Sequence, residues 1–209
     1  MKKVLISLGL LTLTGCALAD GIEDLTTFLK TTQTATGSFE QTVYSRGEEQ
    51  KNQAGSGDFS FLRPGCFRWH YRAPFEEVMV SDGKTLWLYD KELEQVTVKR
   101  LTAALPATPA SLLFGNNDFH KDFNVKNLDT EGDDFHWIVA TPKDEASTFS
   151  EVRIAFKGAK PVKMQLEDNF GQETRLVFTQ IETNVPMKAK DFHFEPPKGV
   201  EVLEDKTFF

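Results

Sequence analysis

The chain has 209 residues, with 31 acidic side chains against 24 Lys and Arg, so its formal net charge is −7. An acidic chain binds nucleic acid poorly and is not attracted to anionic lipid surfaces. Its length is enough for one domain or at most two.

The first residues have the order of a secretory signal. Met1–Lys3 supplies positive charge, residues 4–13 form a short apolar run, and residues 17–19 (ALA) place small side chains before Asp20. The sequence therefore predicts a signal peptide over residues 1–19. The apolar run is too short to cross a bilayer as a stable helix.

The mature chain is expected to be one soluble domain over residues 20–209. Loss of Lys2 and Lys3 with the signal takes the formal charge from −7 to −9. Cys66 is then the only cysteine, so the core must hold the fold without an internal disulfide.

An alternative reading of the same signal stays open. Residues 13–16 (LTGC) also resemble a lipobox, in which Cys16 would be lipidated and become the first mature residue. The protein would then be anchored to a membrane rather than soluble.

The mature chain begins with apolar residues at helical spacing, separated by charged ones. This pattern predicts one amphipathic helix over residues 21–35, ended by Gly37. The residues of its apolar stripe are Ile22, Leu25, Phe28 and Leu29.

From residue 39 onward the dominant pattern has period two, which is typical of half-buried antiparallel strands. Residues 81–84 (SDGK) and 169–172 (NFGQ) have the composition of hairpin turns. We expect about ten strands that meander in sequence order. The alternating positions are Phe39, Gln41 and Val43; Phe59 and Phe61; Phe67, Trp69 and Tyr71; Val78 and Val80; Leu86 and Leu88; Val96 and Val98; Val152, Ile154 and Phe156; Met164 and Leu166; Leu176 and Phe178; and Phe192 and Phe194.

The strand pattern breaks once, between residues 101 and 124. Thr108 is suited to cap a short helix that begins at Pro109 and ends before Gly115. Proline is unsuited to central strands, so this insertion is expected outside the sheet. Its apolar residues, Leu112, Leu113 and Phe114, predict that it packs on a sheet face.

The strand parity places most of the 18 Phe, three Trp and three Tyr side chains on one side of the sheet. The N-terminal helix and the 101–124 insertion are the available covers for that side. They are too small to fill it, which favours an apolar cavity of the kind that binds a lipid-like ligand. An ordinary packed α+β core is the alternative.

Several motifs along the chain resemble the outer-membrane lipoprotein carrier family, LolA. The resemblance covers nearly the whole mature chain, and the motifs are specific when taken together. They are residues 61–69 (FLRPGCFRW), 80–89 (VSDGKTLWLY), 93–96 (LEQV), 108–109 (TP), 168–172 (DNFGQ) and 192–200 (FHFEPPKGV).

The resemblance implies a fold and an activity. The fold is α+β and mainly antiparallel β: a strongly curved, open half-barrel of about ten or eleven strands, with a helical lid over an apolar cavity. The activity is transfer in the periplasm by a monomeric carrier without a cofactor. It would take acylated lipoproteins from an ABC-type exporter in the inner membrane and deliver them to an outer-membrane acceptor.

The resemblance also implies six ligand-binding residues. Arg63 would latch the lid through hydrogen bonds to backbone carbonyls, and five residues would line the cavity: Trp69, Met79, Leu112, Leu113 and Phe114. From the residues alone, Arg63 also fits a rim arginine paired with a carboxylate. Trp69 and Met79 likewise fit ordinary core positions.

The sequence shows no recognisable catalytic motif. The four histidines are scattered, without a pair at metal-ligand spacing, and neither a Gly-x-Ser-x-Gly elbow nor an HExxH motif is present. Cys66 reads as a small buried or rim thiol. We therefore expect no catalytic residue and no metal site.

Two other functions stay open beside the soluble carrier. A chain lipidated at Cys16 would resemble the outer-membrane acceptor, and the same fold could serve as a periplasmic sensor of lipoproteins or lipids. A basic docking patch for a partner must be local in so acidic a chain. Weak candidates for it are Arg68, Arg72, Lys99 and Arg100.

Overall fold

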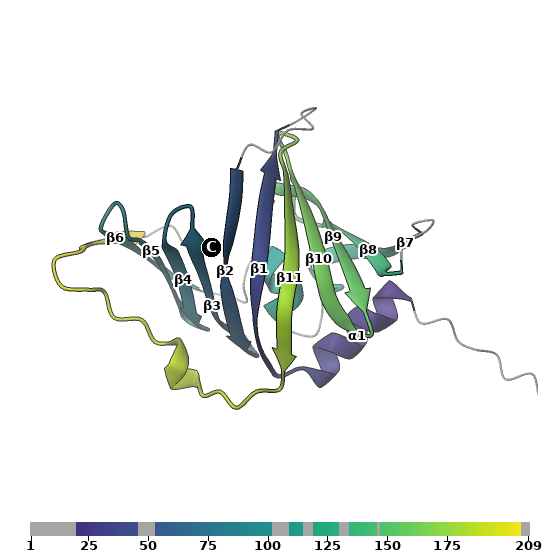
Figure 1. Cartoon of the computed structure of the whole chain (residues 1–209), viewed down its shortest axis with the longest axis horizontal. Coiled ribbons are helices and arrows are strands. Elements are labelled where there is room, and N and C mark those ends of the chain that lie inside the picture. Colours follow the sequence, from purple (N-terminus) through teal and green to yellow (C-terminus); the bar gives the residue numbers. More distant parts are fainter. Residues whose placement is uncertain are drawn as a thin grey trace, which may run out of the picture.

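One sheet dominates the molecule. The computed structural model describes residues 20–45, 53–101, 109–114, 119–129, 134–145 and 147–205. Within them, a 12-stranded sheet has the order β12-β6-β5-β4-β3-β2-β1-β11-β10-β9-β8-β7. In Figure 1 the outer strands recede behind the central ones, so the sheet is curved and open. The predicted signal peptide, residues 1–19, lies outside the described residues.

The strands are 5 to 11 residues long. Their bounds are β1 Thr34–Tyr44, β2 Gln53–Leu62, β3 Cys66–Ala73, β4 Glu77–Asp82, β5 Thr85–Asp90, β6 Gln95–Arg100, β7 Phe123–Leu128, β8 His136–Pro142, β9 Phe149–Lys157, β10 Lys160–Asp168, β11 Glu173–Thr183 and β12 Glu201–Asp205.

The sheet has more strands than the ten or eleven expected, because β7, β8 and β12 have no clear alternation in the sequence. One predicted strand is wrong. Phe192 ends a 3-10 helix, η1 (Ala189–Phe192), and Phe194 follows it in irregular chain. Two apolar residues spaced by one position satisfy the strand pattern without a neighbouring strand to pair with.

The expected single meander is also wrong. Strands β1 to β6 follow one another, and so do β7 to β11, but the two series join through the pair β1 and β11. Phe39 in β1 faces Gly57 on β2 and Phe178 on β11. β12 then returns to the far edge and pairs in parallel with β6.

The two predicted hairpin turns are confirmed. Gly83 between β4 and β5 has φ 87°, and Gly171 between β10 and β11 has φ 80°. Both values lie in the left-handed region, which glycine enters without strain. Asp82 Oδ1 accepts hydrogen bonds from the backbone N–H groups of Lys84 and Thr85 and so fixes the first turn.

The N-terminal helix, α1, is shorter than predicted. It spans Gly21–Thr31, and the Asp20 side chain caps it by accepting from Glu23 N at 2.8 Å. The prediction that it runs to residue 35 is wrong, because β-branched threonines favour the extended chain that begins β1 at Thr34. Gly37 lies within β1, where an added Cβ would come 2.8 Å from the Phe59 ring.

Polar contacts join α1 to one end of the sheet. Asp24 is buried, and its carboxylate contacts His136 Nδ1 on β8 at 2.7 Å and accepts from the backbone N–H of Ala159 at 3.1 Å. The apolar stripe of the helix, Leu25, Phe28 and Leu29, enters the core. Figure 1 shows α1 across the lower ends of β9 and β10.

The short helix α2 spans Pro109–Phe114, as the sequence predicts. Thr108 and Gly115, its predicted cap and end, lie outside the described residues. Leu112, Leu113 and Phe114 are 1–3% exposed and belong to the main core cluster. In Figure 1 this helix lies behind β1 and β11, on the side toward which the sheet curves.

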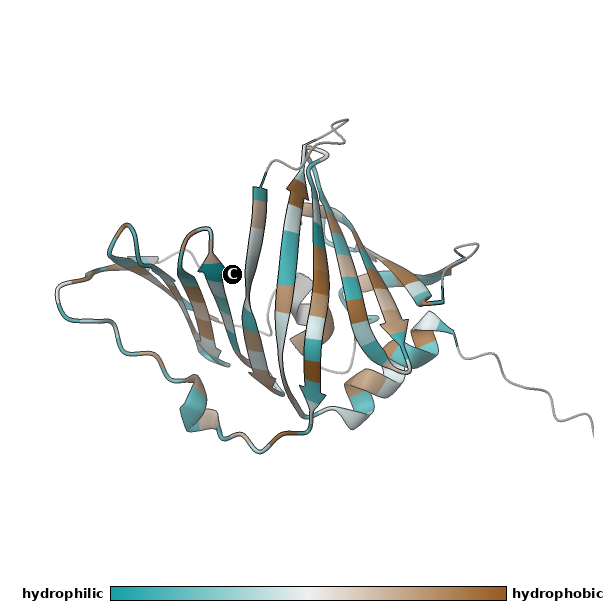
Figure 2. Cartoon of the chain, viewed as in Figure 1, coloured by the Kyte–Doolittle hydropathy of each residue, from teal (hydrophilic) through white to brown (hydrophobic). Residues whose placement is uncertain are grey.

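The two faces of the sheet carry different side chains, and Figure 2 shows polar and apolar bands alternating along its central strands. We call the α2 side the inner face; it holds the main core. The other side, the outer face, has a second apolar cluster built from Cys66, Val78, Val80 and Phe192. The C-terminal segment with η1 covers that cluster.

Candidate ligand-binding site on the inner face

The structure brings the six predicted ligand-binding residues together. Trp69 and the α2 residues Leu112, Leu113 and Phe114 are buried in the main core cluster, and Met79 is partly buried against it. Arg63 reaches the same cluster from the end of β2. No observation tests their contact with a ligand, so their binding role stays a prediction.

Phe114 lies at the centre of an aromatic group. Its ring centroid is 4.9 Å from that of Phe61, 5.9 Å from Phe59, 6.0 Å from Trp69 and 6.2 Å from Phe67. These rings come from β2 and β3, and each faces inward by strand parity. A residue of a short helix outside the ladder therefore fills the middle of the aromatic inner face.

Trp69 connects this group to β1 and β4. Its ring stacks on Phe39 at 4.2 Å and on Phe59 at 5.6 Å. Met79 is its register partner on β4. Stacked aromatic rings with a flexible thioether beside them form a surface that adapts to apolar groups of different shape.

Arg63 is buried, with 7% of its surface exposed. Its Nε donates to the Thr32 backbone oxygen at 2.9 Å, and its guanidinium lies 4.9 Å from the Phe61 ring centroid and 5.4 Å from that of Phe28. Burial lowers its pKa to about 10, so the group keeps its charge at neutral pH. The side chain lies on the apolar side of the sheet.

The hydrogen bond from Arg63 Nε ends at the C-terminus of α1. Thr32 is the C-terminal cap residue of α1, and its backbone oxygen follows the last helical turn. A cation at a helix C-terminus stabilises the exposed carbonyls there. The predicted latch therefore has a partner in the N-terminal helix that the sequence did not indicate.

Several inner-face residues were not singled out as site residues. Phe39, Phe59, Phe61 and Phe67 surround the predicted ones, and Phe28 adds the α1 side. The sequence did indicate them, because the same period-two alternation that places Trp69 on the inner face also places the four strand residues there. Gln41 and Tyr71 share that parity and place polar atoms on the inner face.

The remaining candidate groups do not gather into a reactive site. Cys66 is buried in the outer-face cluster, and burial, with a smaller effect of Asp82, raises the pKa of its thiol. This is the opposite of what activates a cysteine nucleophile. Within the described ranges, no group of three or more His, Cys, Asp or Glu is suited to hold a metal ion.

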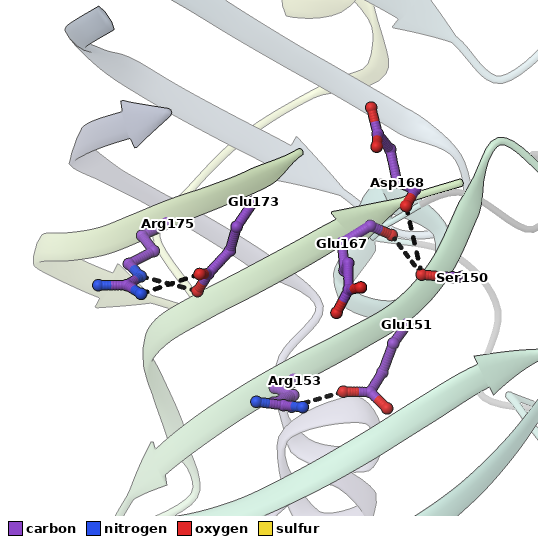
Figure 3. Close-up of polar contacts among 7 residues, drawn as sticks. All are labelled: Ser150, Glu151, Arg153, Glu167, Asp168, Glu173 and Arg175. Atoms are coloured by element: carbon purple, nitrogen blue, oxygen red, sulfur yellow. Dashed lines mark hydrogen bonds and ion pairs between the residues drawn. The ribbon is translucent and has the colours of Figure 1, made fainter. Parts of the chain in front are cut away.

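The outer face of β9 to β11 is polar, as Figure 3 shows. Arg175 binds Glu173 through two nitrogens at 2.7 and 2.8 Å, and Arg153 pairs with Glu151. Ser150 Oγ donates to the Glu167 backbone oxygen at 3.1 Å. The apolar core residues of these strands therefore lie on the inner side.

Of the weak docking candidates, Arg72 is in an ion pair with Asp58 at 2.8 Å. Arg68 is partly buried, and burial lowers its pKa. A basic docking patch stays a prediction. No helix in the described part of the chain is long and apolar enough to cross a membrane.

Fold and site together define a class: proteins with one open, curved sheet whose inner face carries an apolar core under short helices. The model of the family described as outer membrane lipoprotein carrier protein LolA matches residues 30–195. The chain belongs to this family.

Curated relatives match this chain over almost its full length. An outer-membrane lipoprotein carrier protein of Chromobacterium violaceum is 42% identical over 187 residues, covering 90% of this chain and 89% of the relative. One of Nitrosospira multiformis is 40% identical over 206 residues, covering 98% of both chains.

A solved structure shares the fold at low identity. The crystal structure of an uncharacterized conserved protein from Thermus thermophilus matches with a TM-score of 0.54 and 11% identity, covering 88% of this chain and 99% of the other. At this identity the likeness concerns the fold alone.

Proposed function

We propose that this chain is a soluble, monomeric periplasmic carrier that binds the acyl chains of lipoproteins on its inner face and catalyses no reaction. The observation that carries the proposal is the position of α2. Leu112, Leu113 and Phe114 belong to no strand, yet they occupy the aromatic inner face at 1–3% exposure. An acyl chain has the same chemistry as the side chains it would displace.

The energetics favour such an exchange. An acyl chain of about 16 carbons represents on the order of 12 kcal/mol of transfer free energy. A preformed empty pocket would retain that whole gain and release its cargo too slowly. The helix α2 must leave the rings of Phe59, Phe61 and Trp69 before a ligand enters. This movement costs part of the transfer free energy, so the net affinity stays low enough for the cargo to be released.

In this proposal α2 and α1 are the lid, and the cavity forms when α2 moves aside. Arg63 holds the closed, empty state through Thr32 on α1. The cargo comes from an ABC-type exporter in the inner membrane and goes to an acceptor in the outer membrane. The two curated relatives described above, both named outer-membrane lipoprotein carrier protein, support this assignment.

The test is native mass spectrometry of the protein purified from the periplasm, with the N-terminus and any bound molecule determined together. The proposal expects Asp20 at the N-terminus and a bound acylated lipoprotein. A triacylated Cys16 in the membrane fraction would identify an anchored acceptor instead. A periplasmic protein that never carries a lipoprotein would contradict the carrier role.

A sensor of lipoproteins or lipids is separated from a carrier by the fate of the cargo. The purified, loaded protein is mixed with outer-membrane vesicles that contain the acceptor, and the lipoprotein in the vesicle fraction is measured. A carrier transfers its cargo, whereas a sensor keeps it.

A further inference from the structure

Three polar groups lie on the inner face at one end of the aromatic group. They are the Trp69 indole N–H and the Tyr71 hydroxyl on β3, and the Gln41 amide on β1. All three residues alternate inward with their neighbours, Gln41 with Phe39, and Tyr71 with Trp69 and Phe67. Polar atoms in an apolar surface of this kind need partners, so their hydrogen bonds matter.

Tyr71 and Gln41 are joined by a hydrogen bond that passes over the strand between them, β2. The Tyr71 hydroxyl donates to Gln41 Oε1 at 2.9 Å, although β2 lies between β1 and β3. The register explains how they meet. Gly57 and Gly55 are the inward positions of β2 at this level, opposite Phe39 and Gln41, so no side chain separates the two groups.

The indole N–H of Trp69 is buried and has no hydrogen-bond acceptor in the residues that the structure describes. Trp69 as a whole is only 8% exposed. Burial raises the pKa of the Tyr71 hydroxyl, and a weak hydrogen bond from Trp69 opposes this rise, but that contact is too poor to satisfy the indole N–H. A buried donor without an acceptor is costly in a folded protein and therefore requires an explanation, such as a partner that arrives with the ligand.

We propose that Trp69, Tyr71 and Gln41 form a subsite for the carbonyl oxygen of an acyl group. This inference rests on the proposed function and adds to it the orientation of the ligand. An ester or amide carbonyl is the polar atom nearest to every acyl chain, and it accepts hydrogen bonds. Trp69 donates its N–H to this oxygen, and the Gln41 amide, which the hydrogen bond from the Tyr71 hydroxyl orients, supplies a second donor through its NH₂ group.

The subsite fixes which way the chain lies. Tyr71 is near the end of β3 that leads to Ala73, whereas Phe61 and Phe67 face each other at the other end, next to Arg63. The carbonyl therefore lies at the Tyr71 end. The hydrocarbon tail runs past Phe59 and the place now taken by Phe114 toward Arg63.

The experiment compares two ligands of equal size, methyl laurate and pentadecane, which have the same number of non-hydrogen atoms. Affinities are measured for the wild-type protein and for Trp69→Phe, which keeps an aromatic ring and removes the N–H. We expect Trp69→Phe to weaken the binding of methyl laurate about fivefold more than the binding of pentadecane, because one hydrogen bond is lost. In wild-type protein labelled with ¹⁵N, the Trp69 indole proton should move further downfield with the ester than with the hydrocarbon, because only the ester accepts its hydrogen bond.

Two further variants complete the test. Trp87→Phe, on the outer face, is the matched control and should leave both affinities unchanged. Tyr71→Phe keeps its ring and gives an independent test if Trp69→Phe folds poorly; it too should weaken the ester selectively. An equal loss for both ligands would overturn the subsite and leave Trp69 as apolar lining. If neither ligand binds the wild-type protein, the proposed function fails, and the subsite with it.

Discussion

The Nε atom of Arg63 donates a hydrogen bond to the backbone oxygen of Thr32, 2.9 Å away, and so joins the end of β2 to the end of α1. One residue of the turn after β2 thereby holds the end of helix α1 against the sheet. The charge is held over the rings of Phe28 and Phe61, where water is excluded.

Replacement of Arg63 by Leu should make the carrier retain its cargo. Leu keeps the apolar packing but loses the bond that stabilises the closed, empty state, so the loaded state becomes relatively more stable. A charged hydrogen bond of this kind corresponds to roughly a tenfold change in affinity. The measurement is transfer of bound lipoprotein to acceptor vesicles, with Arg153→Leu on the outer face as control. Normal transfer by Arg63→Leu would rule out the latch.

Leu113→Asp should weaken ligand binding while the sheet stays folded. Leu113 is 2% exposed on α2, outside the strand ladder, so a carboxylate there disrupts the apolar surface without removing a strand hydrogen bond. Co-purification of lipoprotein and far-UV circular dichroism are measured together. Leu93→Asp, at a site 70% exposed, is the control. Loss of the β-sheet spectrum in Leu113→Asp would show instead that the sheet needs this residue in order to fold.

Asp24→Asn should loosen α1. The Asp24 carboxylate binds His136 at 2.7 Å and the Ala159 N–H at 3.1 Å, and a neutral amide replaces only part of this. We expect a loss of about 1–3 kcal/mol in the free energy of unfolding, measured by urea denaturation. Glu23→Gln, one residue away and exposed, should change little. Equal stability of the two variants would show that Asp24 does not hold the helix.

The Cys66 thiol should resist alkylation in the folded protein. Burial raises its pKa, so as the pH rises through the range where an ordinary cysteine ionises, about 8.5, the folded protein should react more slowly than the denatured chain. Phe192→Ala removes a ring that packs against Cys66 and should speed the reaction. Iodoacetamide labelling followed by mass spectrometry measures both rates. Equal rates in folded and denatured protein would contradict the burial.

Period-two alternation was sufficient to locate most strands and the inward-facing site residues. Trp69, Phe59 and Phe39 share a face because side chains alternate along a strand, and the structure places them in one stack. The span of helix α2 was predictable, since Pro109 begins it and the apolar residues Leu112, Leu113 and Phe114 end it. These features depend on local chain geometry alone.

Features that depend on distant pairing were not predictable. Alternation does not specify partners, so the contact between β1 and β11 and the parallel pairing of β12 had no local signal. β7 has a single buried residue, Phe123, and so lacks a repeating pattern. The partner of Arg63 depends on where α1 ends. The helix ends at Thr31 rather than at the predicted residue 35, because threonine favours extended chain.

The pairing of β1 with β11 also sets the order in which the molecule can be completed. Phe39 pairs with Phe178, which is synthesised much later, so the central strands β1 and β11 cannot pair until most of the chain is present. Contacts so distant in sequence slow folding. Until then β1 has an unpaired edge beside an uncovered row of aromatic rings, a state prone to aggregation. The emerging chain is therefore exposed to aggregation until β11, its last long strand, is available.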